Sequence, residues 1–231
     1  MNEALSLAVA TLARGEAAQR LELYVRLLLE RNTGLNLTGA RDVPSALEQI
    51  RDSLTLVPYV REPLIDIGSG GGFPAIPLAI VTGMRVTLVE SVLKKARFLE
   101  EMARVLELPL DVRSLRAEEA ARDPALRAAF HSATARAVAG LTTVLELAVP
   151  FLTIGGLAVL QRGGLGVAEK AAAVDAALVL GAEVEAEIAA GTGDGGRSLL
   201  LVRKTASTGP RFPRRTGIPA KRPLCWEGRD A

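Results

Sequence analysis

The sequence predicts an α/β protein in which a mostly parallel sheet is covered by helices on both faces, and three observations support this. From residue 64 onward, short apolar runs of strand length alternate with segments of helical length. A glycine-rich stretch directly follows the first of these runs. The last two strand-like runs are joined by a connector that is too short for a crossover helix, so we expect them to pair antiparallel.

Composition narrows the class of protein before any motif is considered. The chain has 231 residues, 49% of them hydrophobic, which suffices for one large domain with appendages. It lacks an uncharged apolar run of about 18 residues and the basic start of a secretory signal, so we expect a cytoplasmic protein without membrane association. Cys225 is the only cysteine and His131 the only histidine. We therefore expect no disulfide and no metal site, and an ordinary strand-edge role for His131.

Residues 1–60 are expected to form a helical cap. An apolar stripe that includes Leu21, Tyr24 and Leu28 predicts a helix over residues 16–31. Asp42 is a suitable N-cap for a second helix over residues 43–58. We expect these helices to cover one side of the sheet.

Residues 61–204 are expected to form the core. Pro74 suits the first turn of the helix after the glycines, Ser91 is expected to cap a helix, and Gly155-Gly156 is expected to form a turn. The expected strands are 64–67, 86–90, 111–113, 133–136, 157–161, 183–188 and 199–203, and after the second strand we expect helices at 92–106, 118–129 (broken), 142–151 and 167–180. Gly191–Gly196 is the expected connector of the final pair.

The end of the first strand carries the strongest functional signal. Asp66, Gly68, Gly70 and Gly72 follow the pattern D-x-G-x-G-x-G, with Ser69 and Phe73 in the same turn. Glycines permit tight turns and close approach of a ligand to the backbone. Glu90 ends the second strand, where a carboxylate suits the two hydroxyls of a ribose. Together these features predict an adenosine-containing cofactor, and the glycine spacing favours S-adenosylmethionine over NAD.

Three further strand ends should meet at the same edge of the sheet, because ligands bind beyond the carboxyl ends of parallel strands. After the third strand, Ala117 and Glu118 are candidates to supply a backbone amide and a polar edge to the adenine. Arg136, among small apolar residues, either pairs with an acidic neighbour or faces a ligand. Arg162 either contacts RNA or is an ordinary surface arginine.

The charge of the chain is unevenly distributed. Residues 203–231 hold eight basic and two acidic residues, whereas the remainder holds 20 basic and 24 acidic ones. We read residues 205–231 as an extended basic arm, and an anionic partner such as nucleic acid is one explanation of its charge. The alternatives are a tail that only aids solubility and a packing strap that docks on the body through Phe212, Ile218, Leu224 and Trp226.

The motifs together resemble those of the RsmG (GidB) family, which methylates N7 of a guanine in the small-subunit ribosomal RNA of bacteria. The resemblance covers nearly the whole chain. It is carried by Asn32, Asn36–Thr38 with Arg41-Asp42, Asp52–Leu54, Asp66–Pro74, Lys94–Leu99, Arg116–Glu118, Ala135–Ala137, Pro213–Gly217 and Pro219–Leu224.

The resemblance implies a Rossmann-like methyltransferase fold, with a seven-stranded sheet that ends in an antiparallel hairpin. It implies S-adenosylmethionine as cofactor, S-adenosylhomocysteine as product, 16S ribosomal RNA or the small subunit as partner, and no obligate protein partner. Guanine N7 has a lone pair and no proton, so no catalytic base is expected and no catalytic residue is assigned. The candidate RNA-binding residues are Arg97, Arg162, Arg214, Arg215, Lys221 and Arg222.

The sequence departs from the family pattern at Arg31, Gln49 and Arg162, where the family usually has Trp, His and Lys. We expect the first to alter packing, the second to remove a polar contact near Asp52, and the third to change donor geometry while keeping the charge. Two other readings stay open: a methyltransferase of the same fold that acts on a small molecule or a protein, and a module that binds S-adenosylmethionine without catalysis.

Overall fold

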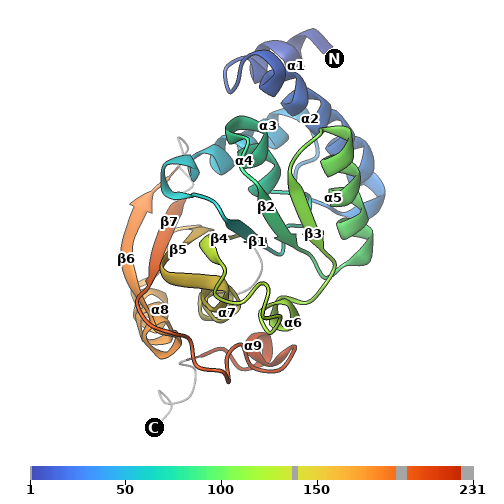
Figure 1. Ribbon diagram of the computed structural model, residues 1–231. Coiled ribbons are helices and arrows are strands. Elements are labelled where there is room, and N and C mark those ends of the chain that lie inside the picture. The colour runs from blue at the N-terminus through green and yellow to red at the C-terminus, as the bar shows by residue number, and fades with distance from the viewer. Residues whose placement is uncertain (1, 137–139, 191–196, 225–231) are drawn as a thin grey trace.

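The computed structural model describes residues 2–136, 140–190 and 197–224, which fold around a seven-stranded sheet in the order β3-β2-β1-β4-β5-β7-β6 (Figure 1). The strands β1 to β5 run parallel, and β7 lies antiparallel between β5 and β6. This confirms the predicted fold class. The strands are β1 (Leu64–Ile67), β2 (Val86–Val89), β3 (Leu110–Arg113), β4 (Phe130–Arg136), β5 (Leu152–Arg162), β6 (Ala182–Ala189) and β7 (Ser198–Lys204).

Helices cover both faces of the sheet, so the central strands are apolar on both sides. All four residues of β1 and of β2 are buried. Along β5, Leu157 and Val159 join the core on one face, and Ala158 and Leu160 join the core on the other. The helices are α1 (Asn2–Val9), α2 (Gly15–Leu35), α3 (Val43–Leu54), α4 (Ala75–Thr82), α5 (Leu93–Val105), α6 (Ala117–Ala120), α7 (Leu141–Ala148), α8 (Val167–Leu180) and α9 (Ile218–Lys221), with 3-10 turns at Val57–Tyr59 and Val149–Phe151.

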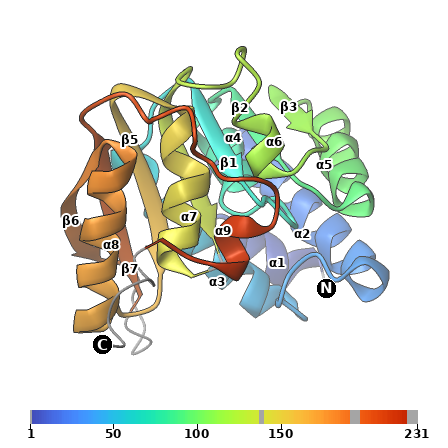
Figure 2. The ribbon, with the colours of Figure 1, turned by 90° about the horizontal axis from the view of Figure 1, so that it is seen from below.

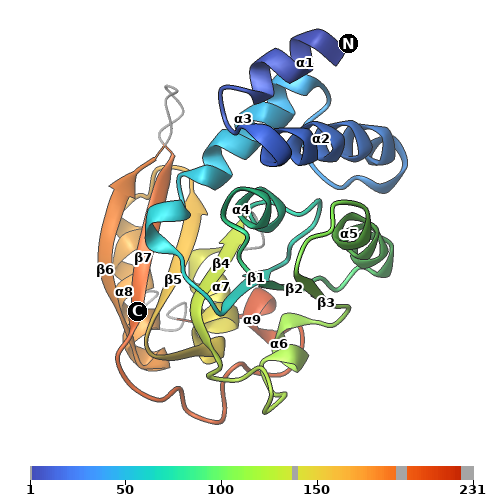
Figure 3. The ribbon, with the colours of Figure 1, turned by 45° about the horizontal axis from the view of Figure 1, so that its top comes forward.

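The N-terminal helices pack on α4 and α5 and extend the core on that side of the sheet (Figure 3). As predicted, Asp42 is the N-cap of α3: its side chain accepts from the backbone N–H of Ser45 at 2.9 Å. The helix ends at Leu54, earlier than predicted, and a short 3-10 turn that contains Pro58 follows. On the opposite face, α7 and α8 lie in front of the sheet (Figure 2).

Three local predictions are wrong. The N-cap of α5 is Val92 rather than Ser91, because the carboxylate of Glu90 accepts from the Val92 N–H at 2.7 Å. Gly155 and Gly156 lie inside β5 at an irregularity in its pairing with β4, so they do not form a turn that precedes the strand. Gly155 has φ +83°, a conformation that suits glycine. Residues 118–129 hold only the single helical turn α6 before they continue as turns.

Residues 205–224 do not extend away from the body but pack along the α6–α8 side of the sheet (Figure 2). The Arg127 guanidinium donates to the carbonyls of Phe212 at 2.8 Å and Thr208 at 3.0 Å. Phe212 is buried and Leu224 packs against the same core. These contacts are those expected for the packing-strap alternative. Trp226, which belongs to that alternative, lies outside the described residues, as do the connector Gly191–Gly196 and Ala137.

Candidate functional site

The glycine loop turns sharply from β1 into α4. Gly68 donates to the Val89 carbonyl at 2.8 Å, which ties the start of the loop to the end of β2. Gly70 has φ +56° and Gly72 has φ +98°, both in the left-handed region. A Cβ atom on Gly72 would lie 2.3 Å from Cδ1 of Ile76. The loop therefore requires glycine at these positions, as the sequence predicts.

Helix α2 holds the other side of this loop in place. The buried Tyr24 hydroxyl donates to the Gly71 carbonyl at 2.7 Å, and its ring lies 5.5 Å from that of Phe73, centroid to centroid. A Cβ atom on Gly71 would approach the Leu37 carbonyl oxygen to 3.1 Å. The sequence pattern indicates Tyr24 only as part of an apolar stripe, because its contact with the loop spans 47 residues of chain.

Glu90 links the glycine loop to the segment after β2. One carboxylate oxygen accepts from the Gly70 N–H at 2.9 Å and the other from the Val92 N–H at 2.7 Å. The residue is 5% exposed. A carboxylate has about four lone-pair positions, so both oxygens retain the capacity to accept from ribose hydroxyls. The backbone bonds fix the carboxylate at the position where the sequence predicts ribose binding.

Asp66 is fully buried below the loop. Its Oδ1 accepts from the Thr134 hydroxyl at 2.7 Å, whereas Oδ2 has no hydrogen-bond partner within the described part of the chain. Burial raises the pKa of Asp66 to about 6. A buried acceptor without a donor fits a ligand that brings a positive charge, and S-adenosylmethionine carries an ammonium and a sulfonium group. The residues at this site therefore fit the cofactor that the sequence predicts.

A cavity of about 170 Å³ continues the site past the ends of β1 and β2. Gly68, Ala117 and Glu118 line it, and Ala117 and Glu118 are the residues that the sequence predicts beside the adenine. Gly217 and Ala220 of the C-terminal segment line it as well. The Gly217 N–H donates to Glu118 Oε1 at 2.9 Å. The sequence does not predict that the arm forms part of this cavity.

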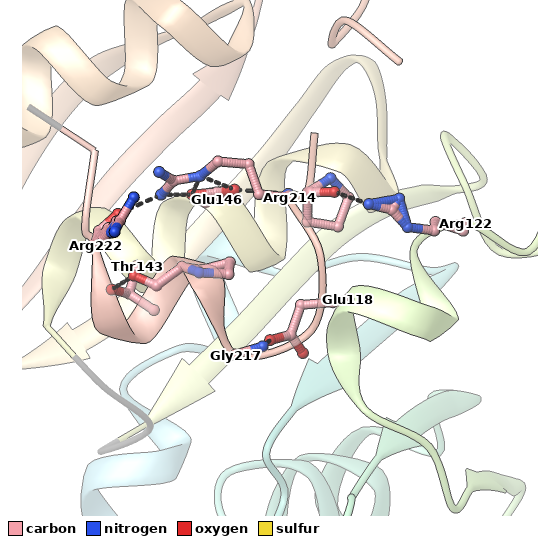
Figure 4. Close-up of polar contacts among 9 residues, drawn as sticks. Glu118, Arg122, Thr143, Glu146, Arg214, Gly217 and Arg222 are labelled. Carbon is pink, nitrogen blue, oxygen red and sulfur yellow. Dashed lines mark hydrogen bonds and ion pairs between the residues drawn. The ribbon is translucent and has the colours of Figure 1, made fainter. Parts of the chain in front are cut away.

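A buried ion pair holds the arm at this position (Figure 4). The carboxylate of Glu146 on α7 is fully buried, and Arg214 donates to it through Nη2 at 2.6 Å and Nε at 2.9 Å. Thr143, also on α7, donates to the Pro219 carbonyl at 2.9 Å. Arg214, a candidate for RNA binding, is thus engaged inside the chain. The other basic candidates of the arm, Arg215, Lys221 and Arg222, are exposed.

Arg136 leaves β4 beside the glycine loop. Its guanidinium carbon lies 5.0 Å from the centroid of the Phe73 ring, and Nη2 donates to Gln49 Oε1 at 2.6 Å. Burial lowers the pKa of Arg136 from its ordinary value. Gln49 Oε1 also accepts from the Thr38 hydroxyl at 2.6 Å. The Gln49 side chain therefore bridges Thr38 and Arg136; the loss of a polar contact near Asp52 stays a prediction.

The remaining candidates lie farther from the loop. Arg162, at the end of β5, is 16% exposed in its side chain and lies 3.8 Å from Glu169 Oε1. Arg97 is exposed on α5 and does not line the cavity past the ends of β1 and β2. Arg31 pairs with Glu101 of α5 at 2.9 Å. His131 is exposed on β4, where Nδ1 lies 2.5 Å from the Glu62 carbonyl oxygen.

Residues 2–136, 140–190 and 197–224 contain neither a metal-binding cluster nor a helix able to span a membrane. Among them, no three His, Cys, Asp or Glu side chains gather in a way that suits a metal ion. No helix within these ranges has the length and apolar character needed to cross a bilayer.

Comparisons with known proteins agree with this geometry. Residues 17–196 match the GidB family model, described as rRNA small subunit methyltransferase G. The chain is 45% identical over 209 residues to Ribosomal RNA small subunit methyltransferase G of Chloroflexus aggregans, with 87% of each chain covered. It is 38% identical over 216 residues to the protein of that name from Desulfitobacterium hafniense, with 91% of this chain and 90% of the relative covered.

Solved structures at lower identity share the fold. A mutant of MtNAS in complex with S-adenosylmethionine superposes with a TM-score of 0.55 at 19% identity, over 89% of this chain and 79% of that one. The mitomycin 7-O-methyltransferase MmcR gives a TM-score of 0.51 at 14% identity, over 82% and 68% of the two chains. The resemblance that the sequence motifs indicate is confirmed: the chain belongs to the GidB family, rRNA small subunit methyltransferase G.

Proposed function

We propose that this protein transfers the methyl group of S-adenosylmethionine to N7 of a guanine in the small-subunit (16S) ribosomal RNA. The observation that carries the proposal is the position of Glu90, whose buried carboxylate is bound by the loop N–H of Gly70 beside the cavity that Ala117 and Glu118 line. This arrangement suits the ribose and adenine of the cofactor. Family membership and the N7 chemistry of the family supply the substrate.

In the proposed reaction the N7 lone pair forms a bond to the methyl carbon while the carbon–sulfur bond breaks and its electron pair passes to sulfur, so that S-adenosylhomocysteine leaves and no proton moves. The chain therefore needs to orient its ligands rather than to remove a proton. Glu90 binds the ribose hydroxyls, Glu118 and the backbone of Ala117 bind the adenine edge, and Asp66 faces the positively charged part of the cofactor. The glycines allow the backbone to approach it.

The basic candidates Arg97, Arg162, Arg215, Lys221 and Arg222 are proposed to contact the RNA. The last three lie on the arm and are exposed, which suits contacts with phosphates. Arg214 is proposed to support RNA binding indirectly, because its ion pair with Glu146 holds in place the segment that carries these three residues. A ribosomal substrate would place the protein in the cytoplasm, as the sequence predicts.

The proposal is tested by offering the purified chain tritium-labelled S-adenosylmethionine together with naked 16S RNA, assembled small subunits, cell protein freed of RNA, or a small-molecule extract of cells. Transfer to RNA or to subunits supports the proposal, and their ratio reveals the assembly stage that is recognised. Transfer to protein alone, or to small molecules alone, would support the other methyltransferase reading. Cofactor binding without transfer to any of them would support the non-catalytic reading.

A further inference from the structure

A second cavity, of about 420 Å³, is lined in part by Arg136, whose guanidinium also lies over Phe73 of the glycine loop. Its volume falls in the range of small-molecule sites. Its walls come from α3, from the ends of β4 and β5 and from the residue directly before β7. The polar and charged residues that line it are Gln49, Asp52, Arg136, Gln161, Arg162 and Arg197. The cofactor residues described above, apart from Arg136, do not line it.

Gln161 is the most informative residue of this cavity. It is 6% exposed, and its Nε2 donates to the Asp52 carbonyl oxygen at 3.1 Å. This bond fixes the orientation of the amide, because the opposite orientation would place two acceptors against each other. Oε1 is buried and has no hydrogen-bond partner in the ranges that the structure describes. A buried acceptor without a donor is costly, and a ligand that donates would remove the cost.

Asp52 provides a second acceptor. Its side chain is 10% exposed, and its Oδ2 forms an ion pair with Arg197, which also binds Glu48 at 2.9 Å. One ion pair leaves lone pairs of the carboxylate available. Asp52 and Gln161, which carry these two acceptors, and Arg136, which carries guanidinium donors, thus line the same cavity.

We propose that this cavity binds the target guanine, a proposal that rests on the proposed function. The Watson–Crick edge of guanine carries the N1–H and N2 amino donors beside the O6 acceptor. In our assignment Gln161 Oε1 and the Asp52 carboxylate accept from N1–H and the N2 amino group, and Arg136 donates to O6. Adenine offers neither an N1–H nor a 2-amino group, so the same set selects guanine.

This orientation of the guanine also determines where its reacting atom, N7, points. N7 lies on the edge of the purine opposite the N2 amino group, so a base held by Asp52 and Gln161 presents N7 toward Arg136. Arg136 in turn lies over Phe73, the last residue of the glycine loop before Pro74. The base and the cofactor then meet at Arg136. Gln49 holds this arginine in place, since its Oε1 accepts from Arg136 Nη2 at 2.6 Å.

The test uses inosine, which keeps N7 but lacks the N2 amino group. Borohydride and aniline treatment, which cleaves RNA at N7-methylguanosine, first maps the nucleotide that the full-length protein modifies. RNA with inosine at that nucleotide is then compared with the unmodified RNA. Loss of one hydrogen bond to a buried acceptor should reduce kcat/KM about ten- to a hundredfold. Equal rates for guanosine and inosine would overturn the proposal.

Two variants assign the effect to the cavity. Methyl transfer to guanosine should fall in both Gln161→Leu and Asp52→Asn. In at least one of these variants, the ratio of kcat/KM for guanosine RNA to kcat/KM for inosine RNA should fall toward one. Calorimetric affinity for the cofactor should stay unchanged in both, and Gln19→Leu, on the exposed surface of α2, is the matched control. If both variants keep the wild-type ratio, the cavity assignment is wrong. If the wild-type chain methylates no guanine at N7, the proposed function itself fails.

Discussion

The backbone N–H of Gly217 donates to the carboxylate of Glu118 at 2.9 Å, although 99 residues of chain separate them. The bond joins a basic segment near the C-terminus to the cavity where the adenine is expected. Both residues line that cavity. The C-terminal segment is therefore a wall of the candidate cofactor site as well as a candidate RNA contact, and its two roles can be separated by substitution.

Arg214 and its neighbour Arg215 form a matched pair for this separation. Arg214→Ala would leave the fully buried Glu146 carboxylate without its ion pair. Breaking a buried pair costs about 3–5 kcal/mol, and the partial exposure of Arg214 favours the lower end. We expect a lower Tm and weaker S-adenosylmethionine binding by calorimetry, because the segment that holds Gly217 loosens.

Arg215→Ala should behave differently, because Arg215 is exposed. We expect an unchanged Tm and unchanged cofactor affinity, with a slope of log RNA affinity against log salt that is shallower by about 0.7–0.9 for one lost phosphate contact. Equal effects of the two substitutions on Tm and on cofactor affinity would contradict the division of roles.

The glycine loop gives a second prediction. Gly70 has φ +56°, and a β-branched side chain at this position is strained and occupies the space next to the ligand. Gly70→Val should abolish S-adenosylmethionine binding in calorimetric titration. Gly34→Ala in α2 is the control, since a Cβ atom there meets nothing within 4 Å. Wild-type affinity in a folded Gly70→Val protein would remove the loop from the cofactor site.

Glu90 gives a third prediction. Hydrogen bonds to a charged acceptor contribute about 1.5–3 kcal/mol, so Glu90→Ala should weaken binding of S-adenosylmethionine and S-adenosylhomocysteine about ten- to a hundredfold. A 2′,3′-dideoxy analogue should bind wild type and variant with similar affinity, because the ribose donors are already missing. If the analogue loses as much affinity as the natural ligand does on substitution, Glu90 does not bind the ribose.

Asp66 predicts a pH dependence of stability. Burial raises its pKa to about 6 from 3.8, so the folded chain favours the neutral carboxyl. Below about pH 4 the carboxyl is neutral in the folded state, whereas at pH 8 it is ionised there at a cost of about 3 kcal/mol. Asp66→Asn does not titrate. Relative to wild type, its free energy of unfolding should therefore rise by about 2.5 kcal/mol between pH 4 and pH 8, because the unfolded carboxyl is already about half ionised at pH 4.

Urea denaturation of wild type and Asp66→Asn at pH 4, 6 and 8 measures this change in the free energy of unfolding. The contributions of the other titrating groups cancel in the difference between the two proteins. A difference that stays constant over this range would show that the Asp66 carboxyl keeps an ordinary pKa.

The sequence predicts the sheet and the cofactor loop well, because both depend on local patterns. The apolar run at β1, the glycines after Asp66 and the acid at the end of β2 are each visible within a few residues. The docking of the arm is different. It depends on Arg214 meeting Glu146 across 68 residues, and the residues near Arg214 alone also fit an exposed basic tail.

The cavity proposed to bind the guanine shows the same limit of prediction from sequence. Asp52 is visible as part of a motif, but the unpartnered oxygen of Gln161 is not, since Gln161 reads as the last residue of an apolar strand. Their contact joins α3 to β5 across 109 residues. Side-chain hydrogen bonds between distant elements are set by packing, which a pattern of residue types does not specify.

The most direct test of the account is the position of the transferred methyl group. Small subunits that lack N7-methylguanosine should be incubated with the wild-type chain and S-adenosylmethionine, and their 16S RNA should then be treated with borohydride and aniline. We expect cleavage at one guanine, dependent on the cofactor and absent with Gly70→Val. Methyl transfer into the RNA with no cleavage at any guanine would contradict N7 as the site of reaction.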